Sequence, residues 1–202
     1  CVGREALDPV LEEWFSAGSF QSRSTQEWRT YLLEAFPDLS AQMDVGEWLD
    51  APGLPSDAPR PESDALTRVD GELQRLAEGS PCSELNSDGW VTGQWLRFLN
   101  GLPVGIGAKA MAELDLNFGF GVNGNSEILF AWLRLAIREG YSKADERLEE
   151  FLTTVGRRKF LMPLYEELCA TPEGRARAEI IYRKARPGYH AVSAISLDSL
   201  FD

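Results

Sequence analysis

Histidine is almost absent from this chain, and most catalytic and metal-binding motifs are excluded with it. The single histidine is His190, whereas an H-E-x-x-H zinc site needs two. A Ser-His-Asp triad or a Cys-His dyad has one candidate base, near the end of the chain, where a solvated or structural histidine is expected. By itself the sequence therefore contains no complete active site, and we expect neither a catalytic residue nor a metal ligand in it.

Cysteine is scarce as well. Cys1, Cys82 and Cys169 are odd in number and have no C-x-x-C spacing, which excludes a disulfide framework and a zinc finger and predicts free, mostly buried thiols. Free thiols favour the cytoplasm, and the sequence leaves a periplasmic or secreted location open. Because residue 1 is Cys rather than Met, we expect a piece of a longer protein; a processed or lipidated terminus is the alternative.

Basic residues and long apolar runs are also lacking. The 32 Asp and Glu outnumber the 20 Lys and Arg, and the net charge is -12. Such a chain repels phosphate, so neither nucleic acid nor an anionic membrane is expected as its partner. No apolar run approaches the roughly 18 residues that span a bilayer. Against this background the stretch VGRRKFLMPLY, residues 155–165, is unusual because it contains three consecutive cations.

Sustained apolar and polar alternation, the signature of strands, is missing, and helical spacing takes its place. Short connections between amphipathic helices predict an all-α fold of HEAT-like or armadillo-like helical layers, an α-α superhelix, although no strict repeat is visible. From apolar spacing and capping residues, helices are expected at 6–17, 24–37, 43–49, 63–78, 87–100, 107–114, 126–138, 143–154, 157–169 and 172–185.

Four prolines between residues 50 and 62 remove amide donors and predict an extended surface linker, the one candidate domain boundary. The glycines of 101–107 are expected to form a turn, because a phosphate-binding loop follows a strand and no strand is expected before them. Adjacent acidic pairs such as Glu166-Glu167 are expected to be solvated faces of helices. The aromatic residues Trp90, Trp95, Phe98 and Trp132 fall at helical spacing and are expected in the core.

Four runs in this chain resemble the C-terminal region of zinc aminopeptidases of the leukotriene A-4 hydrolase type, within the aminopeptidase N-like metallopeptidases. They are WLDAPGLP at 48–55, NSEILFAWLRL at 125–135, GRRKFLMPLY at 156–165 and YHAVSA at 189–194. Their order and spacing fit across essentially the whole chain, so the resemblance concerns the chain rather than one motif.

The resemblance implies that a preceding thermolysin-like domain carries H-E-x-x-H, binds the zinc and performs catalysis. None of that domain's motifs occurs here. Residues 1–49 would be its last helices, residues 50–62 a proline-rich linker, and residues 63–202 the C-terminal helical domain, which walls one side of the substrate cleft. The full-length enzyme would be a zinc metallo-aminopeptidase, whereas these 202 residues alone would be inactive. Its partners would be short peptides and its own catalytic domain, in a monomer.

The resemblance also gives the cations of residues 155–165 a role. In the family, the Arg and Lys of a G-R-x-K-F motif bind the free carboxylate of a short peptide, and these match Arg157 and Lys159. An arginine fork beside an ammonium suits a carboxylate, and cations in a first helical turn combine with free amides to attract anions. No such role is expected for Arg158. Without the resemblance, all three cations would be read as solvating a helix start or pairing with the surrounding acids.

Two alternatives remain open on the sequence alone. The chain could be a stand-alone helical-repeat scaffold that binds a protein partner along its concave face. It could also belong to a relative that lost its zinc ligands and kept the helical domain. The presence of an upstream catalytic domain would distinguish the enzyme from the scaffold. Intact zinc ligands in that domain would distinguish the enzyme from the inactive relative.

Overall fold

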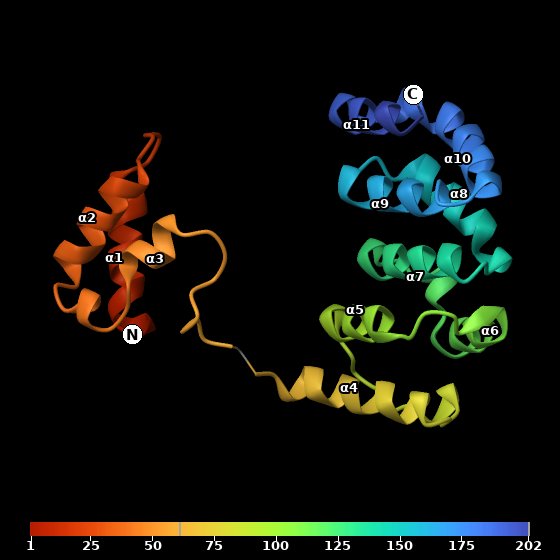
Figure 1. Ribbon diagram of the computed structural model, residues 1–202, viewed down its shortest axis with the longest axis horizontal. Coiled ribbons are helices and arrows are strands. Elements are labelled where there is room, and N and C mark those ends of the chain that lie inside the picture. The colour runs from red at the N-terminus through yellow and green to blue at the C-terminus, as the bar shows by residue number, and fades with distance from the viewer. Residues whose placement is uncertain (61, 202) are drawn as a thin grey trace. The chain divides into compact units, whose positions relative to one another are not determined.

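The computed structural model describes residues 1–60 and 62–201 of the chain and forms two compact units, Cys1–Glu62 and Ser63–Asp202 (Figure 1). Two predictions touch residues outside this description: Pro61 of the linker and Asp202 at the end of the helical domain. Within the described ranges every regular element is a helix, so the all-α prediction is confirmed there. None of these helices is both long and apolar enough to cross a membrane.

The first unit contains three α-helices and one short 3₁₀ turn. Its second helix begins with a capping box: the Glu27 amide donates to Ser24 Oγ at 3.3 Å, and the Ser24 amide donates to the Glu27 carboxylate at 2.7 Å. The elements are α1 (Arg4–Ala17), α2 (Thr25–Ala35), η1 (Leu39–Ala41) and α3 (Val45–Asp50).

Few apolar side chains of this unit are covered. Among its described aliphatic and aromatic residues, those buried are Leu39 and Val45, while Phe20 is fully exposed. The rings of Trp14, Trp28 and Tyr31 pack against one another, with Trp14 5.2 Å from Trp28 and 5.1 Å from Tyr31. Together with Pro55, these few buried side chains make a thin core for 62 residues, and the unit exposes apolar surface of the kind that marks an interface.

After Asp50 the chain forms bends and a turn, as its prolines require. The turn is closed by a 3.1 Å hydrogen bond from the Ala58 amide to the Pro55 carbonyl. One feature departs from the predicted surface linker, because Pro55 is buried.

The second unit is a stack of helices in two layers (Figure 1). In one layer, α4, α5, α7, α9 and α11 contact one another in that order, and α6, α8 and α10 lie in the other. Their bounds are α4 (Asp64–Ala77), α5 (Thr92–Gly101), α6 (Gly107–Phe118), α7 (Ser126–Arg138), α8 (Asp145–Thr154), α9 (Arg158–Leu168), α10 (Pro172–Ala185) and α11 (Ala191–Phe201). The 3₁₀ turns are η2 (Cys82–Glu84), η3 (Phe120–Val122), η4 (Ser142–Ala144) and η5 (Arg186–Gly188).

Hydrogen bonds between first turns show that the helices of the first layer run parallel. Gln94 in α5 donates to the Ala65 carbonyl in α4 at 3.3 Å, and Asn125 before α7 donates to Thr92 Oγ1 in α5 at 3.0 Å. Farther along the stack, Ser193 in α11 donates to the Gly156 carbonyl before α9 at 3.0 Å. The amino-terminal ends, with their partial positive charge, therefore gather at one edge of the layer.

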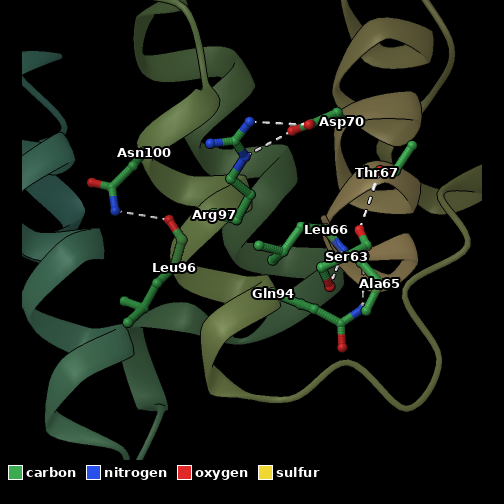
Figure 2. Close-up of polar contacts among 9 residues, drawn as sticks. All are labelled: Ser63, Ala65, Leu66, Thr67, Asp70, Gln94, Leu96, Arg97 and Asn100. Carbon is green, nitrogen blue, oxygen red and sulfur yellow. Dashed lines mark hydrogen bonds and ion pairs between the residues drawn. The ribbon is translucent and has the colours of Figure 1, made fainter. Parts of the chain in front are cut away.

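The contact between α4 and α5 shows how one helix of the layer is fastened to the next (Figure 2). Arg97 binds both carboxylate oxygens of Asp70, at 2.8 and 3.0 Å, as a two-pronged ion pair. The Gln94 amide joins the helix starts, and its oxygen also accepts the Val91 amide at 3.2 Å. These polar contacts fix the register in which the apolar faces meet.

The core of the second unit is continuous from α4 to α11. Trp132 and Tyr165 are its largest fully buried side chains. Phe98 is buried as well, while Trp90 and Trp95 are partly buried and pack against the core, as predicted for aromatic residues at helical spacing. Helix α9 buries one apolar face in this core: Phe160, Leu161, Leu164 and Tyr165.

Two helix predictions were wrong. The helix expected from residue 87 begins at Thr92, because Gly89 has a positive φ of 72° and Val91 is the extended N-cap residue. Helix α11 (Ala191–Phe201) was not predicted. His190 accepts the Val192 amide at 3.3 Å through Nδ1 at its start, so this exposed histidine closes a helix end.

Of the acidic pair Glu166-Glu167, one side chain is in solvent and the other forms ion pairs with a neighbouring helix. This corrects the expectation that both are solvated. Glu166 is exposed, but Glu167 in α9 accepts hydrogen bonds from Arg134 at 3.0 Å and Arg138 at 2.8 Å, both in α7. The Arg138 hydrogen bond, with help from Arg134, lowers the pKa of the Glu167 carboxyl. This carboxylate therefore joins the carboxyl-terminal halves of two neighbouring helices.

The last helix is held by one carboxylate. Asp198 in α11 accepts 2.7 Å hydrogen bonds from Arg186 at both oxygens and a 2.6 Å hydrogen bond from the buried Tyr182 hydroxyl. The hydrogen bonds from Arg186 and then Tyr182 lower the pKa of Asp198 from 3.8 to about 2.

We expect Asp198→Asn to lower the melting temperature of the chain at neutral pH. The pKa of Asp198 falls on folding, so its stabilisation is complete above about pH 4 and is lost as the pH falls through about 2. Melting curves of the wild type and the variant between pH 7 and pH 2 measure this. The difference in melting temperature should persist to about pH 4 and shrink below it, and a difference that does not change with pH would contradict the assignment.

Candidate functional site

The site begins where α9 starts, at the edge of the layer formed by helix amino termini. Helix α8 ends at Thr154, and the Val155 amide still donates to the Phe151 carbonyl at 2.9 Å. Arg157 is the N-cap residue of α9, with φ of -80° and ψ of 117°, and no side chain caps the helix. The first amides of a helix have no partner within it, so they are available to an anion here.

Helix α11 holds this helix start in place. The hydroxyl of Ser193, which is 3% exposed, donates to the Gly156 carbonyl at 3.0 Å. Arg158 donates from Nε to Ser196 Oγ at 2.8 Å. Arg158 therefore belongs to the contact between α9 and α11.

Arg157 is exposed, and its guanidinium carbon lies 5.9 Å from the centre of the Phe160 ring. Across residues 1–60 and 62–201 its guanidinium forms no ion pair or hydrogen bond with another residue. Its charge is therefore not offset by a direct partner in the described part of the chain. A guanidinium in this state offers two parallel donors to a carboxylate.

Lys159 lies over the same ring, with Nζ 4.8 Å from the centre of Phe160. Unlike Arg157, it has a partner, because Nζ forms an ion pair with Glu127 Oε1 at the start of α7. The structure thus brings both predicted cations to one aromatic side chain. It also places a carboxylate among them, so the three side chains carry a net charge of +1.

Glu127 was not predicted at this site from the sequence. It is in the first turn of α7, where a carboxylate is favoured by the helix dipole. The signal that would have found it is the parallel stacking of alternate helices, which brings the first turns of α7 and α9 together. Both lie in runs that carry the family resemblance, NSEILFAWLRL and GRRKFLMPLY.

The described residues do not form a metal centre. Within residues 1–60 and 62–201, no three side chains of His, Cys, Asp or Glu are grouped so that they could hold a metal ion. The thiols of Cys1, Cys82 and Cys169 are free, and of these Cys82 is buried. What the candidate site offers is an arginine, an ion-paired lysine and uncapped helix amides, which suit an organic anion.

Known proteins resemble this chain in sequence and in fold. The sequence profile described as "Leukotriene A4 hydrolase, C-terminal" matches residues 90–200, more than half of the chain. The chain belongs to the leukotriene A4 hydrolase C-terminal family. The resemblance inferred from the four sequence runs is thereby confirmed, and the matched range contains the starts of α7 and α9.

Curated relatives of this leukotriene A4 hydrolase C-terminal chain are aminopeptidases and hydrolases by name. Leukotriene A-4 hydrolase of Xenopus laevis is 27% identical over 205 residues, covering 95% of this chain and 33% of that protein. Aminopeptidase RNPEPL1 of Mus musculus is 26% identical over 201 residues, covering 91% of this chain and 28% of that protein. The chain thus spans about a third or less of the length of these relatives.

Solved structures of yeast LTA4 hydrolase share the fold. The native enzyme has a TM-score of 0.72 and 22% identity, and the match covers 96% of this chain and 35% of that one. The complex with bestatin has a TM-score of 0.75 at the same identity and coverage. The family's helical architecture, predicted from the sequence, is therefore the architecture of this chain.

Proposed function

We propose that this chain is the carboxyl-terminal part of a zinc-dependent aminopeptidase, and that it binds the carboxylate of short peptide substrates through Arg157 and Lys159. The observation that carries the proposal is the start of α9, where Arg157 is exposed without an ion-pair partner among the described residues, beside uncapped helix amides at the edge formed by helix amino termini. Membership of the leukotriene A4 hydrolase C-terminal family supports it, as do the names of the aminopeptidase relatives.

The first unit supports a second part of the proposal, that residues 1–49 are the last helices of a larger catalytic domain. Phe15 is 68% exposed and Phe20 is fully exposed. In the linker that follows residue 49, Leu54 is 82% exposed. Exposed apolar surface beside a thin core is expected when the remainder of a domain covers it. In this proposal that remainder would hold the zinc and the catalytic residues.

In this proposal the chain contributes positioning rather than bond breaking. A carboxylate at the start of α9 would accept two parallel hydrogen bonds from Arg157 and one from Lys159, and the helix amides would add their partial positive charge. Fixing the far end of a di- or tripeptide fixes its scissile bond relative to the catalytic groups, which raises the effective concentration of the reacting atoms. The second unit would thereby wall one side of the cleft.

A stand-alone scaffold is the competing function, and zinc distinguishes the two. The complete protein that contains this chain should hold about one zinc per chain by elemental analysis and should release amino-terminal residues from peptides. Residues 1–202 expressed alone should do neither. A complete protein without zinc and without peptidase activity would contradict the enzyme proposal and favour the scaffold or an inactive relative.

A further inference from the structure

The ion pair between Lys159 and Glu127 joins two helices that are distant in sequence. Lys159 is the second residue of α9 and Glu127 the second residue of α7. Their side chains are 45% and 38% exposed, so a ligand in solution can reach both. Of the two predicted anchors, Lys159 is therefore the one already bound to a carboxylate of the chain.

The backbone under Glu127 is held firmly. Its amide donates to Asn125 Oδ1 at 2.9 Å, and Asn125 in turn donates to Thr92 Oγ1 in α5 at 3.0 Å. The amide of Asn125 donates to Asn123 Oδ1 at 2.8 Å. These bonds fix the start of α7 against α5, so the backbone of Glu127 is held in place at the helix start.

We propose that Glu127 limits the affinity of this site for carboxylates by competing for Lys159, and that it disfavours peptides whose last residue is acidic. The inference rests on the proposed function, because it concerns the same carboxylate site. Arg157, Lys159 and Glu127 together carry +1, which one carboxylate neutralises. A second carboxylate, from a carboxyl-terminal Asp or Glu, would lie near Glu127, and the neighbouring Arg158 donates to Ser196 in the contact between α9 and α11.

The effect of the competition follows from the chemistry of the ammonium. Lys159 has three N–H donors, so it can bind Glu127 and a substrate carboxylate together. The two carboxylates then share one cation and repel each other over a few ångströms, a repulsion that nearby solvent weakens without abolishing. Removing the negative charge of Glu127 should release Lys159 and strengthen carboxylate binding.

The test compares steady-state kinetics of the complete protein and its Glu127→Gln variant on three matched substrates. These are a tripeptide with a neutral last residue, its carboxyl-terminal amide, and a tripeptide ending in Asp. For the free acid, Glu127→Gln should lower KM by about three- to tenfold, a modest Coulomb term at a partly exposed site, with kcat nearly unchanged. The Asp-terminated peptide should gain more, and the amide should not change.

Two controls identify the route of the effect. In the double variant Glu127→Gln, Lys159→Met, the gain should disappear, because the gain acts through the freed ammonium. Glu146→Gln removes the same charge from the first turn of α8, where the exposed Glu146 has no ion pair in the described part of the chain, and should leave KM unchanged. Glu127→Ala serves as a second variant if the Gln variant fails to fold.

The outcomes separate this inference from the proposed function. An unchanged or higher KM for the free acid in a folded Glu127 variant would overturn the inference, as would a gain that persists in the double variant. If the wild type treats the free acid and the amide alike, the carboxylate site itself is wrong, and the inference falls with it.

Discussion

Replacing Arg157 by alanine in the complete protein is expected to lower kcat/KM for a tripeptide by about 10- to 100-fold, the size of one lost hydrogen-bonded charge pair. Arg157 is exposed, and its guanidinium carbon lies 5.9 Å from the centre of the Phe160 ring. Its removal should therefore leave the fold intact. Hydrolysis of an aminoacyl amide reporter, which has no carboxylate to bind, should be nearly unaffected.

The comparison between the two substrates decides whether Arg157 binds the carboxylate. Equal losses on the tripeptide and the reporter would contradict the anchor role. Arg183→Ala is the matched control for net charge, because Arg183 is exposed and donates within its own helix, to the Glu179 carbonyl at 3.3 Å. That variant should retain wild-type kinetics on both substrates.

Replacing Gly174 by alanine is expected to destabilise the packing of α10 on the end of α9 by about 2 to 3 kcal/mol, the range of overpacked sites that cannot relax. An added Cβ would overlap the Leu168 carbonyl oxygen and come within 2.8 Å of Thr171 Oγ1. The carbonyl belongs to the last residue of α9. Relief of the overlap would therefore require a shift of that helix end, since backbone cannot rotate away as a flexible side chain can.

Gly71→Ala in α4 is the matched control, with the opposite expected sign. Nothing lies within 4 Å of a Cβ added to Gly71, so alanine should stabilise this helix by up to about 1 kcal/mol. Hydrogen exchange of the complete protein, followed by mass spectrometry, measures both effects locally. Protection should fall in α9 and α10 for Gly174→Ala and rise in α4 for Gly71→Ala. Unchanged protection in α10 would contradict the steric argument.

Helix ends were predictable where short-range chemistry sets them. The Ser24 and Glu27 capping box is present at the start of α2, and Asn125 caps α7 by accepting the Glu127 amide at 2.9 Å. Such signals lie within three or four residues of the helix end that they define, so they can be recognised in the sequence without any knowledge of packing.

The missed helix α11 had no comparable signal. Its apolar residues fall on all sides, with Ala194 and Leu197 buried and Val192 and Ile195 more than half exposed. Without a polar face there is no stripe of helical period to recognise. The late start of α5 had a different cause, the positive φ at Gly89. Glycine can adopt either sign of φ, so its presence in the sequence does not determine this conformation.

The cations at the start of α9 are visible in the sequence, but the charge balance around them is not. Three consecutive cations in a chain of net charge -12 are visible in the sequence, and the family motif singles out Arg157 and Lys159. The pairing of Lys159 with Glu127, 32 residues away, depends on the register of two parallel helices. That register is set by contacts along the whole stack, beyond the reach of local patterns.

The most direct test of the account is a crystal structure of the complete protein with a slowly hydrolysed tripeptide bound. We predict that the peptide's free carboxylate lies about 3 Å from the Arg157 guanidinium nitrogens, the length of a charged hydrogen bond, and contacts the first amides of α9. A peptide whose carboxylate binds elsewhere, with Arg157 left in solvent, would contradict the central claim that this chain anchors the substrate.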